Sequence, residues 1–204
     1  MANSYFTLEH EGQSKVTEKM SRFLGFAVTV TDPEEAKAVI RDYRNRYHDA
    51  RHLCWAYTIG EERELWQLND NGEPSGTAGK PILGQINSLG LTDVLVVVVR
   101  YFGGIKLGTG GLIEAYRTAA RMALEEAQTE ERHAQGQLAV ICSYISLNAV
   151  MSAIKALNLK IISQDFDNTC RLILSVRLDH LDEAERRLSE AATVERIGDS
   201  DAWV

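Results

Sequence analysis

The longest unbroken hydrophobic run lies near the middle of the chain. Residues 94–99 are all valine or leucine, which predicts a strand that is buried on both faces. From Leu112 onward the apolar positions recur at helical spacing as far as about residue 124. The segment between the two patterns contains Gly103, Gly104, Gly108, Gly110 and Gly111. We therefore expect a buried strand, a glycine-rich turn and a helix in direct succession.

A second glycine-rich stretch, residues 70–81, precedes an apolar helical pattern over residues 82–89. A glycine-rich turn that opens a helix can leave several backbone N–H groups directed at one spot, where the helix dipole also favours negative charge. Two such helix starts in one small domain predict a shared anion-binding site. The alternative is that the glycines serve only tight turns and close packing of the backbone.

The rest of the first 133 residues predicts a mixture of strands and helices. Residues 4–30 are rich in β-forming residues, and Asp32-Pro33 is typical of a helix start. That helix is expected to run to about Tyr47, and further strands are expected at 51–59 and 65–68, with residues 125–132 as the charged end of the helix from 112. We expect all three helices on one face of the sheet, which is a two-layer α/β sandwich in an α+β protein.

Residues 133–136 are predicted to be a linker, so we expect one domain over residues 1–133 and another over 134–204. The second domain follows the order β-α-β-β-α-β, which is the ferredoxin-like order. Strands are expected at 137–144, 159–165, 170–178 and 194–197, helices at 147–157 and 181–191, and a tail at 198–204.

Composition narrows the class of function. The 204 residues are 45% hydrophobic and 25% charged, as in ordinary globular proteins, and the net charge of −7 argues against blanket attachment to nucleic acid or anionic membrane. Residues 70–121 are less acidic, with five basic and four acidic side chains. Three widely spaced cysteines give neither zinc-ligand spacing nor a disulfide framework. We expect a cytoplasmic protein with no metal, no cofactor and no membrane association.

The signal for an enzyme is weak. Residues 76–81 lack the spacing of a phosphate-binding P-loop, and Pro81 stands where the magnesium-binding hydroxyl should be. Residues 103–111 do not form a dinucleotide-binding fingerprint. His52 and Glu73 are candidate acid–base groups. The alternative is that His52 is a partly buried strand residue with a backbone partner, and overall the sequence favours binding over catalysis.

Binding is better supported because cationic and aromatic side chains stand beside the glycine backbone. Such groups hold phosphates and splayed bases in RNA sites. The predicted anion or nucleic-acid site comprises Arg51, Gly76, Thr77, Gly79, Lys80, Arg100, Tyr101, Gly103, Gly104, Lys106, Gly110 and Gly111. In the alternative interpretation, Tyr101 and Phe102 cap the core and Arg100 pairs with an acidic neighbour.

Three motifs resemble those of the YigZ/IMPACT family, in its bacterial two-domain form. They appear in the family's order and span about residues 15–130. At Asn71 this chain departs from many members, which carry a second aspartate there, so it lacks the acidic pair of those members. The motifs are Asp49-Ala50-Arg51-His52-x-Cys54-x-Ala56-Tyr57, Asp70-x-Gly72-Glu73-Pro74-Ser75-Gly76-Thr77-Ala78-Gly79-Lys80-Pro81 and Val97-Val98-Val99-Arg100-Tyr101-Phe102-Gly103-Gly104-x-x-Leu107-Gly108-x-Gly110-Gly111-Leu112.

The resemblance implies a first domain like domain 2 of a small-subunit ribosomal protein and a second like the C-terminal part of elongation factor G. Eukaryotic relatives are linked to translational control in amino-acid starvation, and we expect this chain to lack their partner-binding domain. We therefore predict a translation-associated regulatory protein that binds RNA, the ribosome or a ribosome-associated factor. The alternatives are a small hydrolase or transferase acting on a phosphorylated metabolite, and a protein-interaction adaptor.

Overall fold

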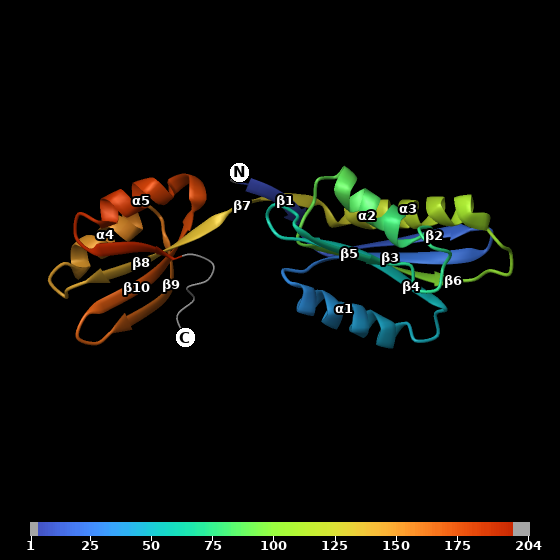
Figure 1. Ribbon diagram of the computed structural model, residues 1–204, viewed down its shortest axis with the longest axis horizontal. Coiled ribbons are helices and arrows are strands. Elements are labelled where there is room, and N and C mark those ends of the chain that lie inside the picture. The colour runs from blue at the N-terminus through green and yellow to red at the C-terminus, as the bar shows by residue number, and fades with distance from the viewer. Residues whose placement is uncertain (1–3, 198–204) are drawn as a thin grey trace. The chain divides into compact units, whose positions relative to one another are not determined.

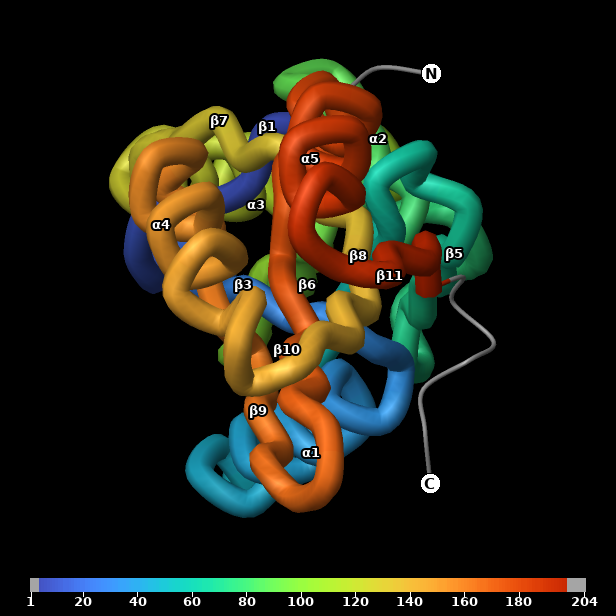
Figure 2. The backbone as a smooth tube through the Cα atoms, turned by 90° about the vertical axis from the view of Figure 1, so that its left-hand side faces the viewer, coloured from blue at the N-terminus to red at the C-terminus, as the bar shows by residue number. Residues whose placement is uncertain are grey.

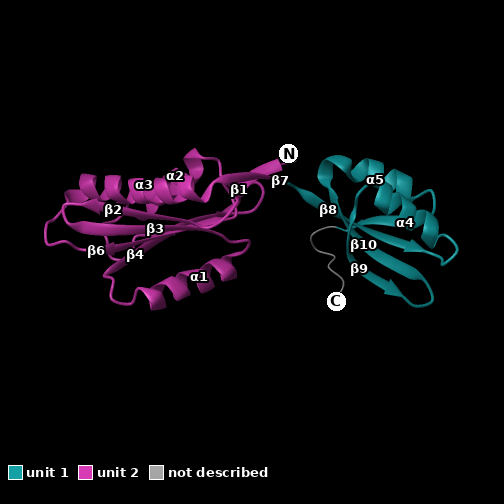
Figure 3. Ribbon diagram, turned by 180° about the vertical axis from the view of Figure 1, so that it is seen from behind, with its two compact units in different colours: residues 1, 133–204 teal, residues 2–132 magenta. Residues whose placement is uncertain are grey.

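The computed structural model describes residues 4–197 (Figure 1). They form two compact units that divide between Arg132 and His133 (Figure 3). The N-terminal unit is built on a five-stranded sheet in the order β2-β3-β6-β4-β5, in which every neighbouring pair is antiparallel. Its strands are β2 (Gly12–Glu18), β3 (Ser21–Thr29), β4 (His52–Ile59), β5 (Leu65–Asn69) and β6 (Val94–Tyr101).

The central strand β6 explains why the valine run contains no polar interruption. It lies between β3 and β4, and residues 94–99 are completely buried. Residues at even positions, such as Val96 and Val98, belong to one hydrophobic cluster, and those at odd positions, such as Val97 and Val99, belong to another. Because successive side chains of a strand point to opposite faces, both faces of the sheet are covered. The predicted burial on two faces is confirmed.

The helices that provide this cover do not all lie on one face. Helix α1 (Pro33–Arg46) packs on the odd-numbered face, whereas α2 (Gly79–Ser88) and α3 (Gly108–Ala127) pack on the even-numbered face (Figure 1). The mixed α+β class is confirmed, but the placing of three helices on one face is wrong, and this unit has three layers rather than two. A central strand that is apolar at every position requires cover on both sides.

Helix α1 starts where the sequence predicts. The Asp32 carboxylate accepts hydrogen bonds from the N–H groups of Glu34 and Glu35 at 2.8 and 2.9 Å, and Pro33 occupies the first helical turn. An aspartate cap of this kind satisfies N–H groups that have no partner within the helix itself.

Helix α3 ends earlier than the charged sequence suggests. Gln128 has φ = +57°, a left-handed conformation that does not continue a helix. Residues Thr129–His133 instead form β7, which pairs with β1 (Ser4–Leu8) in a two-stranded sheet. The predicted linker at 133–136 is reduced to Ala134, because His133 ends β7 and Gln135 begins β8 (Gln135–Cys142). Strand pairing has overridden the helix preference of a glutamate-rich segment.

The C-terminal unit has the predicted ferredoxin-like architecture. Its sheet runs β11-β8-β10-β9 with every pair antiparallel, and α4 and α5 lie side by side over one face (Figures 1 and 2). The predicted tail at 198–204 lies outside the described residues. Beyond β8, the elements are α4 (Leu147–Ala156), β9 (Lys160–Phe166), β10 (Cys170–Arg177), a 3-10 turn (Leu178–His180), α5 (Leu181–Leu188) and β11 (Thr193–Ile197).

Candidate functional site

An open pocket of about 420 Å³ lies in the N-terminal unit, where β4 begins and β6 ends. Both glycine-rich stretches reach it, a proximity that the sequence could not establish. The lining comes from four segments: Arg51 and His52, then Gly72, Glu73 and Pro74, then Arg100 and Phe102, and finally Lys106, Leu107, Gly108, Thr109 and Leu112.

Arg100 stands at the centre of a row of side chains that crosses three strands. Its register partners are Phe23 on β3 and His52 on β4. The guanidinium carbon lies 5.5 Å from the ring centre of Phe23 and 5.7 Å from that of Phe102. A guanidinium at this distance from an aromatic face is attracted by the negative charge of the ring. The strands and the rings therefore hold Arg100 in one place.

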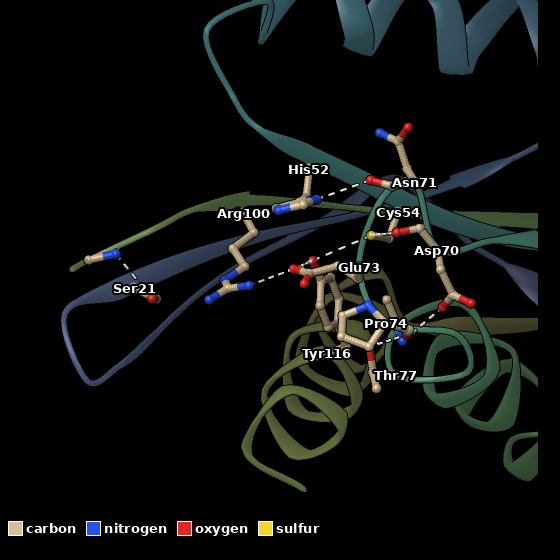
Figure 4. Close-up of polar contacts among 12 residues, drawn as sticks. Ser21, His52, Cys54, Asp70, Asn71, Glu73, Pro74, Thr77, Arg100 and Tyr116 are labelled. Atoms are coloured by element: carbon tan, nitrogen blue, oxygen red, sulfur yellow. Dashed lines mark hydrogen bonds and ion pairs between the residues drawn. The ribbon is translucent and has the colours of Figure 1, made fainter. Parts of the chain in front are cut away.

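Glu73 provides the counter-charge of Arg100. Arg100 Nη1 donates to Glu73 Oε1 at 2.7 Å, and both side chains are buried (Figure 4). The Tyr116 hydroxyl donates to the same oxygen at 2.8 Å. Arg100 therefore pairs with an acidic neighbour, as the alternative interpretation of the sequence held. Its Nε atom, however, is buried and has no hydrogen-bond partner within residues 4–197.

Cys54 and Tyr116 extend this polar network beneath the pocket (Figure 4). Cys54 Sγ lies 3.0 Å from the carbonyl oxygen of Asp70 and 3.4 Å from the Tyr116 hydroxyl oxygen. Burial raises the pKa of the Cys54 thiol to about 12. Burial also raises the pKa of Tyr116, and the neighbouring Cys54 and Glu73 add to the shift. Both groups are therefore protonated at neutral pH, and the thiol is a structural donor rather than a nucleophile.

His52 has a backbone partner, as one of the two sequence interpretations expected. Its Nδ1 lies 3.0 Å from the carbonyl oxygen of Asn71 (Figure 4). Because a carbonyl oxygen can only accept, Nδ1 must carry the hydrogen, and Nε2 of the neutral ring keeps its lone pair. Glu73 also lines the pocket, but its hydrogen bonds within the described residues go to Arg100 and Tyr116 rather than to His52. Asn71, at the position where many proteins of the resembling family carry a second aspartate, contributes its backbone carbonyl oxygen to the contact with His52.

The first glycine-rich loop already contains a carboxylate of its own. Asp70 accepts hydrogen bonds from the N–H groups of Gly76 at 2.8 Å, Ala78 at 3.0 Å and Gly79 at 2.8 Å. The Thr77 hydroxyl donates to the carbonyl oxygen of Pro74 at 2.6 Å. The donors predicted for an external anion are thus used within the loop. The sequence could not show this, because it does not reveal that Asp70 folds back over the loop.

Lys80 and Tyr101, two further predicted site residues, lie away from the pocket. Lys80 is exposed and is not part of the pocket lining. Tyr101 packs with the hydrophobic cluster of the opposite, α1-covered face, and its hydroxyl donates to Asp49 at 2.8 Å. Phe102, which caps the core in the alternative interpretation of the sequence, lines the pocket instead and is 49% exposed. The alternation of side chains along β6 is the signal that could have identified it, since Phe102 follows Arg100 by two positions.

The N–H groups of Ala78 and Gly79 at the start of α2 donate to Asp70, whereas the start of α3 has no such carboxylate acceptor among the described residues. Within the described chain, α3 has no side-chain cap and no acidic residue in its first turn. Leu107, Gly108 and Thr109, at this helix start, line the pocket. The first N–H groups of a helix have no partner in the helix itself, and they carry the positive end of its dipole. Donor capacity is therefore free on the side of the second glycine-rich stretch.

The glycines of this second stretch serve different purposes. A Cβ atom at Gly103 would lie 2.0 Å from the carbonyl carbon of Met20, so close packing explains that glycine. Gly104 and Gly108 have φ of +92° and +73°, which side chains rarely tolerate. Gly110 has helical geometry, and a Cβ atom there would meet nothing within 4 Å. Of these four residues, only Gly108 lines the pocket.

Comparison with known proteins places this chain in a family. The Impact N-terminal domain model matches residues 19–124. The chain is 42% identical over 132 residues to the IMPACT family member YvyE of Bacillus subtilis, covering 65% of this chain and 61% of that protein. It is 38% identical over 150 residues to the IMPACT family member YigZ of Escherichia coli, covering 72% of this chain and 74% of that protein.

A solved structure shares the architecture of both units. It is described as the crystal structure of a hypothetical protein, and it has 29% sequence identity to this chain with a TM-score of 0.78. The similarity covers 98% of this chain and 100% of that one. Among the described residues, no helix is long and apolar enough to cross a membrane. With the Impact N-terminal domain covering more than half of its length, the chain belongs to the IMPACT family.

Proposed function

We propose that this protein is a cytoplasmic, translation-associated regulatory protein that binds RNA, free or within the ribosome, through the pocket at the start of α3. The observation that carries the proposal is the uncapped helix start that opens onto the same pocket as Arg51, Arg100 and Lys106. Helix N-termini and basic side chains are the groups that contact phosphate in nucleic-acid complexes. The proposed site is this pocket, which is smaller than the site predicted from the sequence and keeps its cations Arg51, Arg100 and Lys106.

The charge of the pocket contrasts with that of the whole molecule. Its lining carries three lysine or arginine side chains against the single carboxylate of Glu73, which leaves +2 in a protein of net charge −7. A local concentration of positive charge with apolar walls focuses the electric field on one spot. An acidic protein with such a site is suited to selective rather than indiscriminate contact with RNA.

Family membership supports the connection with translation. The eukaryotic relatives indicated by the sequence motifs are linked to translational control, and the Impact N-terminal domain includes the strands and loops that form this pocket. The pocket thus lies in the part of the chain that matches the family model. The C-terminal unit lies outside the matched residues.

The proposal is tested by co-sedimentation with ribosomes and with total RNA across a salt series. Binding to phosphates should weaken steeply as salt rises, because released counterions drive it. Arg51→Glu and Lys106→Glu should each abolish association, whereas Lys80→Glu, an identical charge change outside the pocket, should retain most of it. Substituting Arg100 is not a suitable test of binding. It breaks a buried ion pair with Glu73 and destabilises the protein, so a loss of association would also follow from unfolding. Association that is unaffected by Arg51→Glu and Lys106→Glu would refute the proposal.

One observation favours a second candidate function. The Nε2 atom of His52 keeps its lone pair beside the cationic lining, which suits a general base in a hydrolase or transferase for phosphorylated metabolites. Glu73 is unavailable as its partner. Screening phosphorylated substrates with the wild type and with His52→Ala tests this candidate. Turnover that survives the substitution would exclude His52 as the base.

A further inference from the structure

The size of the pocket limits what part of an RNA it can hold. At about 420 Å³ it lies toward the small end of the range for small-molecule sites, roughly 300 to 1,000 Å³. Proteins that bind single strands without sequence preference use grooves that follow the backbone, with sites of about 4 to 16 nucleotides per OB fold. This pocket is suited to a single nucleotide rather than to a continuous tract.

The charge of the pocket distinguishes a terminal phosphate from an internal one. Arg51, Arg100 and Lys106 minus Glu73 leave +2, to which the start of α3 adds a partial positive charge. A phosphate inside a strand carries one negative charge. A terminal phosphomonoester carries about −1.5 to −2 at neutral pH, because its second pKa lies near 6. The terminal group matches the charge of the pocket more closely.

Arg100 supplies a second, independent observation that points to an anion site. The residue is only 6% exposed, lines the pocket, and has a buried Nε without a partner within residues 4–197. A guanidinium has five N–H donors, and Glu73 is held by Nη1. Buried donors without partners are rare in native proteins and call for an explanation, such as an absent ion. An anion at the start of α3 would draw on donor capacity that the protein leaves unused.

The walls of the pocket are suited to the rest of a nucleotide. Phe102 is 49% exposed, and Pro74, Leu107 and Leu112 complete an apolar lining. A base can stack on an exposed aromatic ring regardless of its identity, because every base has a π face. The Arg100 guanidinium carbon lies 5.7 Å from the centre of the Phe102 ring, so a cation for the phosphate and an aromatic surface for the base stand next to each other in the lining.

From these four features we infer that the pocket binds one nucleotide bearing a terminal phosphomonoester. The source is the phosphorylated end of an RNA strand or a free mononucleotide, which share this chemistry. The inference rests on the proposed function, because it specifies the ligand of the same site. It excludes an internal phosphodiester as the preferred ligand.

The test compares short single-stranded RNAs of one sequence that differ only in the presence of a terminal phosphate. Fluorescence anisotropy, with the dye at the opposite end, is used for both the 5′ and the 3′ series. We expect the phosphorylated strand of at least one series to bind about 10-fold tighter or better than its hydroxyl-ended counterpart. Lys106→Ala should remove this preference, whereas Lys80→Ala, the same change outside the pocket, should keep it.

Competition with adenosine and uridine monophosphates distinguishes the two sources. A mononucleotide that competes as strongly as the phosphorylated RNA identifies a free nucleotide as a sufficient ligand, whereas competition that is weaker by about 100-fold or more indicates an RNA end. If phosphorylated and hydroxyl-ended RNA bind with equal affinity, and Lys106→Ala abolishes that binding, this inference is overturned and the proposed RNA binding stands. Absence of RNA binding combined with tight mononucleotide binding would overturn the proposed function and leave the inference standing. Absence of both would overturn both.

Discussion

The Tyr116 hydroxyl donates a 2.8 Å hydrogen bond to Glu73 Oε1, the same oxygen that pairs with Arg100. A helix residue, a loop residue and a strand residue therefore meet at a single buried atom. The loop that carries Glu73 also lines the pocket, so the position of the pocket wall depends on this contact. Stability and ligand binding are coupled through Glu73.

Glu73→Gln should lower the stability of the N-terminal unit and strengthen its binding of anions. Removing one partner of a buried ion pair leaves an uncompensated charge and costs about 3–5 kcal/mol. The same change raises the pocket charge from +2 to +3, because one carboxylate is lost. Urea unfolding and phosphate titration of the folded variant measure the two effects. Tyr116→Phe, which removes the hydroxyl's contacts with Glu73 and Cys54 without altering charge, should cost less, about 1.5–3 kcal/mol. Wild-type stability of Glu73→Gln would contradict the prediction.

Asp70→Ala should destabilise the first glycine-rich loop and the start of α2. The carboxylate accepts three backbone N–H groups at 2.8 to 3.0 Å, and the loss of a helix-capping side chain costs about 0.5–2 kcal/mol. Thermal unfolding measures the loss.

Asp70→Asn provides the graded control for this cap. It can keep an oxygen for Ala78 and Gly79, which share Oδ1, while losing the acceptor for Gly76. An intermediate stability is therefore expected for Asp70→Asn. Equal effects of the alanine and asparagine variants would show that the cap does not act through these hydrogen bonds.

Most elements of the fold were predictable because their hydrophobic patterns are local. The Asp32 cap, the run at 94–99 and the ferredoxin-like order each arise from residues close together in the sequence. Two errors arose from contacts between distant residues. The segment 129–133 is a strand because it pairs with β1, more than a hundred residues earlier, and α1 lies opposite α2 and α3 because β6 is apolar on both faces.

The candidate site was predictable only in part for the same reason. Arg100 and Lys106 were recognised as cations beside a glycine-rich turn, Arg51 was included as their neighbour, and all three line one pocket. The side-chain pairing was not readable from the sequence. Asp70 occupies the donors of its own loop, and Glu73 pairs with Arg100 rather than with His52. Each of these outcomes depends on how a loop folds back on itself.

The N-terminal unit should fold alone when β7 is retained. Residues 2–132 form a compact unit, and β7 pairs with β1 within the two-stranded sheet. A fragment comprising residues 1–133 should therefore unfold cooperatively, whereas a fragment ending at residue 127 should be less stable by at least about 1 kcal/mol, since it loses the strand-pairing hydrogen bonds. Urea unfolding followed by circular dichroism compares the two fragments. Equal midpoints would show that β7 contributes nothing to this unit.

Alkaline pH should destabilise the N-terminal unit partly through Cys54. Its thiol has a pKa of about 12 in the folded protein against an ordinary value of 9.0. As the pH rises above 9, the unfolded chain loses this proton first, so the free energy of unfolding falls. For this group the loss is about 1.4 kcal/mol per pH unit, or about 2 kcal/mol at about pH 10.5. Denaturant midpoints at about pH 8 and about pH 10.5 measure it. Cys54→Ala should reduce the pH dependence, and an unchanged slope in that variant would exclude Cys54 as its source.

Gly110→Ala should strengthen the fold and weaken ligand binding. The residue is helical and a Cβ atom there would meet nothing within 4 Å, so alanine should add up to about 1 kcal/mol of stability. Gly110 is not itself part of the pocket lining, but it follows Gly108 and Thr109, which are, in the first turn of α3, where we expect a phosphate to approach the backbone. A methyl group there should hinder that approach and reduce RNA affinity by several fold, about 1 kcal/mol.

Gly84→Ala is the matched control for this experiment. Gly84 is an exposed glycine of α2 with equally open surroundings, and α2 contributes no residue to the pocket lining, whereas the start of α3 does. Both alanine variants should raise the thermal unfolding temperature, but only Gly110→Ala should lose affinity for phosphorylated RNA. Higher stability together with lower affinity in Gly110→Ala indicates a ligand site at the start of α3. If the glycine served only the architecture of the helix start, stability would rise and affinity would not change. Equal binding by the two variants would place the phosphate away from the first turn of α3.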